Sequence, residues 1–371
     1  MAVTTYGVND ALSNRLQAKA LSYEVTKGLE IAPLIGTGPN SIIQQKTEFK
    51  DKGDRITFGL RGRLTGDGVT ENQILEGNEE GLSTFSDTLF INELAHAVRV
   101  KGEDGIDQQR VLFNVRDEGK SALADWYSER MSLAFFLQMG GYTAPTITYR
   151  EQVVATSLVR TGLNATLAPS ATKRLYGNSL ATDQAVGADT TAKMTLDLVL
   201  KAKERARLAN PRIRPVRVNG ADKYVMYLHP TQVVDLQLEA QATGSISWAD
   251  IQLAALRGGE ISNNPIYTGA VGEYMGVVLR ENEDVPTGVH STLNTEEVNV
   301  RRAILMGAQA GVIGFSNRYD KTTPYKWVEE EFDYKRELGI SAQSLYGMKK
   351  TQFNGTDFGV ITVSTYAVAH T

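Results

Sequence analysis

One stretch of the sequence suggests phosphate chemistry by its residue types: positions 58–81, FGLRGRLTGDGVTENQILEGNEEG. It contains six glycines and follows a strand-like stretch, and the backbone N–H groups of such a loop can hold a phosphate. A P-loop also needs a lysine near its end, but no lysine occurs between Lys52 and Lys101. A dinucleotide-binding turn needs a third glycine where this sequence has Glu71. The stretch therefore predicts a hairpin tip that docks on a partner, not a nucleotide site.

Charged residues dominate this tip. Its acids would repel a phosphate and instead favour contacts with positive groups. The candidate contact residues are Arg61, Arg63, Asp67, Glu71, Glu76, Glu79 and Glu80.

Other residues that could do chemistry lack a supporting pattern. The carboxylates of 329–331 and Asp333 could ligate a metal, but a charge run beside an aromatic strand more often forms a solvated face. No two of the four histidines, His96, His229, His290 and His370, have metal-ligand spacing. G-x-S-x-G is absent, although a Ser-His-Asp triad assembled in space stays open. We therefore expect no catalytic residues, no metal and no cofactor.

Composition narrows the class of protein. The chain has 371 residues, 42% of them apolar, which is enough for a sizeable core. A net charge of −4 argues against tight binding to a nucleic acid. The basic stretch 211–217, PRIRPVR, favours a surface loop or a subunit salt bridge. The absence of cysteine excludes disulfides, no secretion signal is visible, and apolar runs such as 131–139 are too short to span a bilayer.

Periodicity predicts an α+β fold with three extended features. The first is an isolated helix over 10–27, whose apolar stripe is Leu12, Leu16, Ala20 and Tyr23. Whether this helix packs on its own domain or on a partner stays open. The second feature is a long hairpin made by strands at 54–60 and 85–100. The third is a long helix over 106–139, with Val111, Val115, Ala122, Trp126, Arg130 and Leu133 on a common face and an end at Gly140-Gly141.

The remaining elements form a mixed body. We expect helices at 191–209 and 247–257, and a buried strand followed by a short helix over 223–237. Paired strands are expected within 327–350, and a last strand in the tail DFGVITVSTYA. Residues 142–190 show no clear pattern. Arms and hairpins of this kind bury little within one chain, so we expect neighbouring subunits to cover them.

This order of elements resembles the major capsid fold shared by tailed bacteriophages and herpesviruses. From about residue 220 onward the sequence also resembles the major capsid proteins of N4-like short-tailed phages. Two segments carry that likeness: one with Gly269, Gly272, Tyr274 and Gly276, and one with Gly347, Lys349, Lys350 and 353–359.

The resemblance implies a division into five parts. These are an N-terminal arm at 1–50, an extended loop at 51–104, a peripheral domain at 105–190 with a spine helix at 106–139, an axial domain at 191–320, and C-terminal strands at 321–371 that return to the peripheral domain. Some relatives lock the loop by a Lys–Asn isopeptide bond, but in this loop no lysine occurs between Lys52 and Lys101, so we expect a non-covalent shell.

The resemblance also implies a function. The chain would be a structural subunit, not an enzyme, that assembles with itself as hexamers and pentamers of an icosahedral virion capsid around double-stranded DNA. Portal, scaffolding and decoration proteins would be its other partners, with no membrane, and assembly would take place in the host cytoplasm. Two alternatives stay open: a bacterial cargo-encapsulating nanocompartment, and a soluble enzyme with an unrecognised site.

Overall fold

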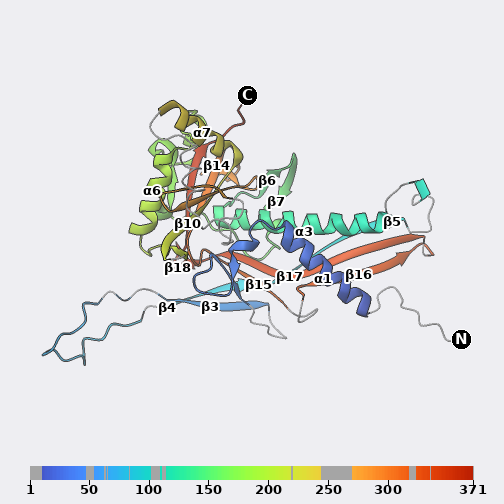
Figure 1. The fold of residues 1–371 in the computed structure, drawn as a ribbon, viewed down its shortest axis with the longest axis horizontal. Coiled ribbons are helices and arrows are strands. Elements are labelled where there is room, and N and C mark those ends of the chain that lie inside the picture. The colour runs from blue at the N-terminus through green and yellow to red at the C-terminus, as the bar shows by residue number, and fades with distance from the viewer. Residues whose placement is uncertain are drawn as a thin grey trace.

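The computed structural model has an elongated body with a loop that projects far from one end (Figure 1). It describes residues 11–46, 54–61, 64, 66–82, 84–101, 109–110, 114–218, 220–243, 270–316, 323–334 and 336–370. A long helix runs along the body, and a taller lobe stands at the end nearer the loop.

Helices and runs of consecutive strands occupy different parts of the chain, as expected for an α+β fold. The α-helices are α1 (Ala11–Gly28), α3 (Val115–Gly140), α4 (Thr156–Val159), α5 (Asp183–Ala188), α6 (Leu196–Leu208) and α7 (Pro230–Thr243). Three short 3₁₀ helices are η1 (Ala32–Leu34), η2 (Ala171–Lys173) and η3 (Gly177–Ser179). The strands before α5 are β1 (Ile35–Gly36), β2 (Ile43–Lys46), β3 (Arg55–Arg61), β4 (Thr84–Phe90), β5 (Asn92–Lys101), β6 (Thr146–Tyr149), β7 (Gln152–Ala155) and β8 (Arg174–Tyr176). The later strands are β9 (Val216–Val218), β10 (Ala221–Leu228), β11 (Ala270–Tyr274), β12 (Val277–Glu281), β13 (Thr287–Val289), β14 (Glu296–Met306), β15 (Gly311–Phe315), β16 (Tyr325–Phe332), β17 (Glu337–Lys350), β18 (Gln352–Phe353), β19 (Thr356–Asp357) and β20 (Val360–Tyr366).

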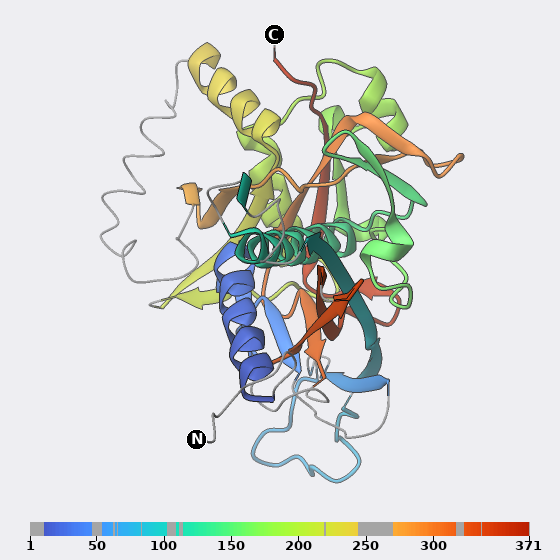
Figure 2. The same ribbon diagram turned by 90° about the vertical axis from the view of Figure 1, so that its right-hand side faces the viewer.

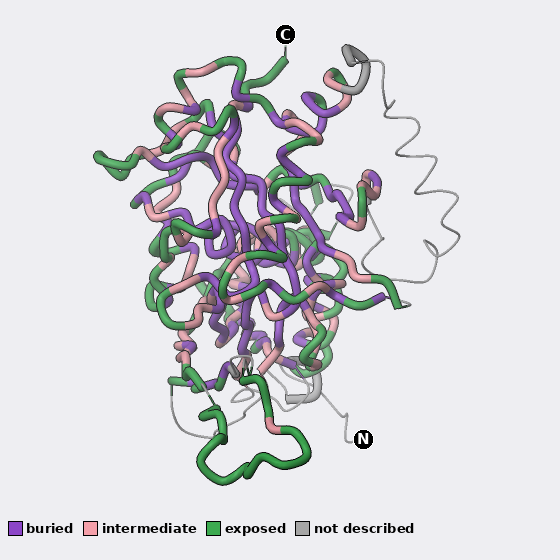
Figure 3. The backbone as a smooth tube through the Cα atoms, turned by 90° about the vertical axis from the view of Figure 1, so that its left-hand side faces the viewer, coloured by how far each residue is buried: buried purple, intermediate pink, exposed green. Residues whose placement is uncertain are grey.

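Two sheets organise the body. The first has the order β1-β2-β15-β17-β16, with β5 also paired to β17, and it runs beside α3 and α1. The second has the order β11-β12-β10-β14-β20-β8, with β13 and β9 at its edges, and it forms the taller lobe with α6 and α7 (Figures 1 and 2). Buried residues concentrate in these sheets and along α3 (Figure 3).

The long helix α3 is shorter than the sequence predicts. The prediction of one helix over 106–139 is wrong at its start, because Asn114 has extended backbone (φ −77°, ψ 115°) and its side chain caps the helix by accepting from the N–H of Arg116. Residues 106–108 and 111–113 lie outside the described part of the chain. The predicted end is confirmed, since Gly141 adopts a left-handed conformation (φ 63°).

The predicted apolar face of this helix is also partly wrong. Ala122 is exposed and Trp126 is only half-buried, whereas Leu123 and Tyr127 are buried. From Met131 onward every residue of α3 is buried, because this half passes between the two sheets.

Helix α1 packs on its own subunit, against α3 and β16. Among its described side chains Ala18, Leu21 and Val25 are buried, and Leu29, directly after the helix, is buried as well. The stripe predicted from the sequence lies on the other side: Leu16 is 68% exposed and Tyr23 is 64% exposed. The helix therefore has two apolar rows, and in the part of the chain that the structure describes one row is covered and the other is exposed at Leu16 and Tyr23.

The predicted hairpin is confirmed for its inner part. Strands β3 and β4 pair antiparallel from Arg55 opposite Phe90 to Arg61 opposite Thr84. The single strand predicted over 85–100 is wrong, because it breaks at Ile91 and its second half, β5, pairs with β17 instead.

Several other predictions are confirmed with shifted bounds. The strand-to-helix passage is present as β10 and α7, and 327–350 holds the paired strands β16 and β17. Helix α6 begins at Leu196 and not at 191, because the Thr195 side chain caps it there. The helix expected at 247–257 lies outside the described residues.

The C-terminal strands are divided between the two sheets. Strands β16 and β17 belong to the sheet beside α3, whereas β20 pairs with β14 in the second sheet. The early strand β8 pairs with β20 as well. The division into domains inferred from the resemblance therefore remains a prediction. Each of the two sheets contains strands from more than one of the proposed domains.

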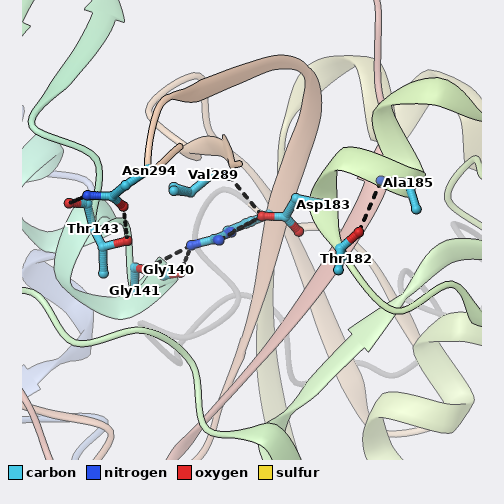
Figure 4. A network of polar contacts seen from close by, with 9 residues as sticks. Gly140, Gly141, Thr143, Thr182, Asp183, Ala185, Val289 and Asn294 are labelled. Carbon is cyan, nitrogen blue, oxygen red and sulfur yellow. Dashed lines mark hydrogen bonds and ion pairs between the residues drawn. The ribbon is translucent and has the colours of Figure 1, made fainter. Parts of the chain in front are cut away.

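A buried ion pair joins the end of α3 to the second sheet (Figure 4). Arg302 on β14 donates to Asp183 at the start of α5, with Nη2 and Nε at 2.6 and 2.9 Å from the same carboxylate oxygen. Arg302 Nη1 also donates to the carbonyl oxygens of Gly140 and Gly141, at 3.2 and 2.8 Å. Because those carbonyls end α3, one guanidinium fixes the long helix to the second sheet.

Candidate functional site

The most unusual surface of the molecule is the extended loop, defined here as residues 64–82. Each described residue in it is exposed except Val69, which is half-buried. Figure 3 shows this loop outside the body, exposed along almost all of its described length. Such a segment gains almost no burial from its own subunit to offset the entropy of ordering it.

The base of the loop is firmly attached to the body. Lys349 on β17 forms an ion pair with Asp87 on β4, with 2.5 Å between Nζ and Oδ1. The Asn164 side chain accepts from the N–H of Phe90 at 3.1 Å and donates to its carbonyl at 2.8 Å. An apolar cluster beneath the hairpin contains Ile56, Phe58, Leu60, Leu89, Val312 and Phe358. The hairpin therefore presents the loop from a rigid support.

The loop has a defined local shape. Gly68 and Gly77 have positive φ values of 73° and 90°, which L-residues with side chains rarely adopt. The Glu80 carboxylate accepts from the N–H of Gly66 at 2.6 Å, which joins the two sides of the loop. The Glu79 carboxylate accepts from the N–H of Gly77 at 2.7 Å.

The structure brings the predicted acidic residues together on this loop. Asp67, Glu71, Glu76, Glu79 and Glu80 are all exposed along it. Two of these acids hold the backbone of the loop itself, a role that the sequence did not indicate. Their contacts with other subunits remain a prediction.

The two predicted arginines lie before the loop. Arg61 is the last residue of β3, and Arg63 lies outside the described residues. Their expected role in contacts between subunits also remains a prediction.

Apolar residues of the loop were missed by the sequence analysis. Ile74 is 73% exposed and Leu75 is 61% exposed, and both lie among the acids. Leu64 and Leu82 are exposed on the two sides of the loop nearer its base. The sequence did contain a signal for this surface, namely two adjacent apolar residues inside a strongly polar stretch. Exposed apolar side chains of this kind often mark a contact with a partner.

A second feature lies beside the base of the loop. An open hollow of about 1250 Å³ is bordered by Leu64 and Leu82 on one side and by the basic stretch 211–217 on the other. Its lining includes Arg207, Arg212, Arg214 and Arg217 together with Leu208, Pro211, Phe353 and Phe358. This stretch was predicted to be a surface loop or a subunit salt-bridge site. Arg217 pairs with Asp222 of the same chain at 3.5 Å, so a salt bridge between subunits remains a prediction.

Of the carboxylates considered for metal binding, Glu329 has a structural role. Glu329 is buried, and both of its oxygens accept from Arg116 Nη2 at 2.8 Å. The Trp327 indole N–H also donates to Glu329, at 2.8 Å. Among the described residues, no group of histidines and acids has the arrangement of a metal site.

The histidines also have structural partners. His96 stacks on Trp126, with 4.2 Å between ring centroids. His229 precedes α7, where its Nδ1 accepts from the N–H of Thr231 at 3.3 Å and its own N–H donates to Gln232 at 2.9 Å. His370 lies 3.0 Å from Asp235.

Comparison with known proteins identifies the family. The family model for phage capsid proteins matches residues 5–369. The chain belongs to the phage capsid protein family. It is 30% identical over 363 residues to the major capsid protein of Pseudomonas phage KPP25, covering 89% of this chain and 88% of that protein.

Solved capsid structures are similar to this chain in fold. The capsid of Ralstonia phage GP4 superposes with a TM-score of 0.76 and 28% identity, covering 99% of this chain and 96% of that one. The capsid subunit of cyanophage Pam1 shares the fold, with a TM-score of 0.64, 20% identity, and coverage of 92% and 93%. This chain is thus a phage major capsid protein, a structural component of the virion whose copies form the capsid shell.

The predicted capsid segment around Lys349 has clear physical roles in this capsid protein. Lys349 attaches the loop hairpin, as described above, and the neighbouring Lys350 forms a buried ion pair with Asp357 at 2.8 Å. Gly347 lies where a side chain would meet the carbonyl oxygen of Phe90 at 2.1 Å. The segment therefore fixes the support of the extended loop.

Within the described residues, no helix combines the length and the apolar character needed to cross a bilayer.

Proposed function

We propose that this capsid protein closes an icosahedral shell, as hexamers and pentamers, by docking its extended loop on a neighbouring copy. One observation carries the proposal: a loop on a rigid base that exposes Ile74 and Leu75 to solvent. Full burial of such a side chain is worth about 1.5–3 kcal/mol. Because part of each side chain is already covered within the subunit, the two together would contribute about 2–4 kcal/mol to the docking of one loop.

The proposal extends to the source and the surroundings of the shell. The segments around Gly276 and Lys349 support a short-tailed phage of the N4-like group as the source. The net charge of −4 suits a shell that confines double-stranded DNA by weak contact. We further propose that the shell forms in the host cytoplasm with scaffolding and portal proteins, and that decoration proteins can bind its surface.

The test is sedimentation velocity of the protein made with and without its phage's scaffolding protein. The intact chain should give a megadalton species in at least one of the two samples. Deleting residues 66–80 should leave a folded, soluble subunit that forms no closed particles.

A point variant makes the test sharper. The double change Ile74→Ser and Leu75→Ser should lower the particle yield strongly, because it removes only the apolar part of the loop. Asn72→Ser, at an exposed position of the same loop, is the matched control and should keep the yield. Normal particle yield from the deletion would show that the loop does not drive closure.

A further inference from the structure

A docked loop needs a receiving surface on the next copy, so this inference rests on the proposed function. We propose that the loop tip around Ile74 and Leu75 docks on the outer face of α1 of a second copy of this chain. The outer face is defined here by Leu16, Lys19, Tyr23 and Lys27.

The outer face is an apolar row left uncovered within the subunit. Leu16 and Tyr23 are 68% and 64% exposed, and they lie seven residues apart, which places them on one side of a helix. At 3.6 residues per turn this row lies about 180° from the buried row of Leu21 and Val25. The buried row holds α1 against α3 and β16, so the outer face is presented on a fixed element.

The charges of the two surfaces are complementary. Around the outer face, α1 carries Arg15, Lys19 and Lys27, with Glu24 as the one acid between residues 15 and 27. Lys27 lies over the Tyr23 ring, 4.3 Å from its centroid. The extended loop has five acids and no lysine or arginine between residues 64 and 82. An apolar pair ringed by acids thus matches an apolar row ringed by basic side chains, which favours this pairing over others.

The positions of the two surfaces suit a ring of subunits. Figure 1 shows the loop leaving one end of the body, with α1 on the other half of it. A contact between different surfaces at opposite sides of a subunit is head-to-tail, and repeated rotation of such a contact produces a closed ring. An extended chain of the length from Arg61 to Gln73 reaches at most about 40 Å, which allows the tip to pass over a neighbouring body.

The arginine-lined hollow is the competing receptor. It also combines basic and apolar groups, and Leu208 at its border is 77% exposed. It lies, however, at the base of the same loop, with Leu64 and Leu82 in its lining. A loop seated there would favour two copies that exchange loops across a two-fold axis, which gives closed pairs and not rings.

Cross-linking tests the inference directly, because the chain contains no cysteine. The variant Leu75→Cys with Tyr23→Cys is incorporated into particles made with the phage's other head proteins, and the particles are treated with a short bis-maleimide. A denaturing gel should show a ladder of covalent multimers, since each copy carries both partners of a head-to-tail contact. Each single-cysteine variant should give no ladder.

The control variant is Leu75→Cys with Leu208→Cys, which probes the hollow. A ladder or dimer from this control, with none from the Tyr23 variant, would overturn the inference and assign the hollow as receptor. Particles that form normally but cross-link through neither pair would also overturn it, while leaving the proposed docking of the loop intact. Failure of the loop deletion to affect assembly would overturn the proposed function itself.

Charge reversal decides the question where a cysteine pair blocks assembly. Lys19→Glu with Lys27→Glu should weaken each loop contact about tenfold, which corresponds to a loss of about 1.4 kcal/mol per contact, and should therefore lower the particle yield strongly. Adding Glu71→Lys and Glu76→Lys to the same chain should restore most of the yield. Equal yields before and after this addition would show that the two surfaces do not meet.

Discussion

The buried ion pair between Asp183 and Arg302 gives the sharpest prediction about the stability of the subunit. The Arg302 side chain is 10% exposed and the Asp183 side chain 2% exposed, so both charges have lost most of their water. Asp183→Asn keeps the shape of the residue but removes the charge that offsets the guanidinium. Removing one partner of a buried pair costs about 3–5 kcal/mol, because the other charge stays buried and uncompensated.

The size of the effect in a thermal experiment follows from the length of the chain. Unfolding entropy of about 2.1 cal/mol/K per residue over 371 residues converts this cost into a fall in Tm of about 4–6 °C. The measurement is circular dichroism of the purified full chain, heated at one fixed rate for all variants. Asp197→Asn is the matched control, because Asp197 pairs with Lys201 on the exposed side of α6. Its cost should stay below about 0.5 kcal/mol.

A double variant separates the lost charge balance from lost packing. Asp183→Leu with Arg302→Met removes both charges, so its Tm should lie closer to that of the original protein than the Tm of Asp183→Asn does. Equal Tm values for Asp183→Asn and Asp197→Asn would refute the large cost assigned to the buried pair. Such a result would mean that Arg302 keeps enough water, or enough support from the carbonyls of Gly140 and Gly141, to do without its partner.

Two further predictions concern helix α3 and the start of α7. Trp126→Ala should lower the free energy of unfolding by about 2 kcal/mol, because Trp126 is half-buried between His96 and Arg130. The change Tyr127→Ala at the buried neighbour should cost more, about 3–5 kcal/mol. Equal losses for the two variants in chemical unfolding would contradict this placement of Trp126. Burial lowers the pKa of His229 to about 3, with Arg301 contributing, so between pH 6.5 and 3 the unfolded chain binds a proton there that the folded chain does not. Stability at this site is therefore full above pH 6.5 and falls as the pH drops, by about 1–2 kcal/mol at pH 4.5 after allowance for partial solvent exposure. His229→Asn, which keeps an acceptor for the N–H of Thr231, should reduce the loss of Tm between pH 7 and 4.5, and an unchanged pH profile would exclude His229 as its source.

The elements best predicted from the sequence are those with local causes. The hairpin of β3 and β4 follows from alternating residues on either side of a glycine-rich stretch, and the passage from β10 to α7 follows from His229-Pro230. The end of α3 at Gly141 is likewise a local matter, since glycine accepts the left-handed conformation there.

The wrong start of α3 has a local cause in its Asn114 cap, but the errors about faces and strand pairing arise where distant residues decide. Helix α1 has two apolar rows, and its sequence alone does not say which row meets α3 and β16, elements far along the chain. The strand predicted over 85–100 divides at Ile91 because β17, more than 200 residues later, supplies a better partner for β5 than β3 does. Periodicity identifies an element and its faces, but tertiary partners choose among the faces.

At the candidate site, too, part of the surface could be predicted from the sequence and part could not. The acidic character of the loop follows from composition, and the structure places all five acids there on an exposed segment. The sequence prediction rested on those charges and left out Ile74 and Leu75, whose burial against a partner would contribute more binding free energy than exposed ion pairs would. Their importance becomes visible only when the structure shows that the body of the subunit does not cover them.

The combination of acids with one apolar pair is what a subunit needs if it folds before it assembles. A loop with several adjacent apolar residues would associate early and irreversibly, whereas acids at Glu71 and Glu76 keep the tip hydrated until a basic surface approaches. A contact worth about 2–4 kcal/mol is weak enough to break and reform, so a wrongly placed subunit can leave. If the loop docks as proposed, each copy in a closed ring would be held at both its loop and its receiving face, and release would require both contacts to break together. Weak docking by one loop is therefore consistent with a durable shell.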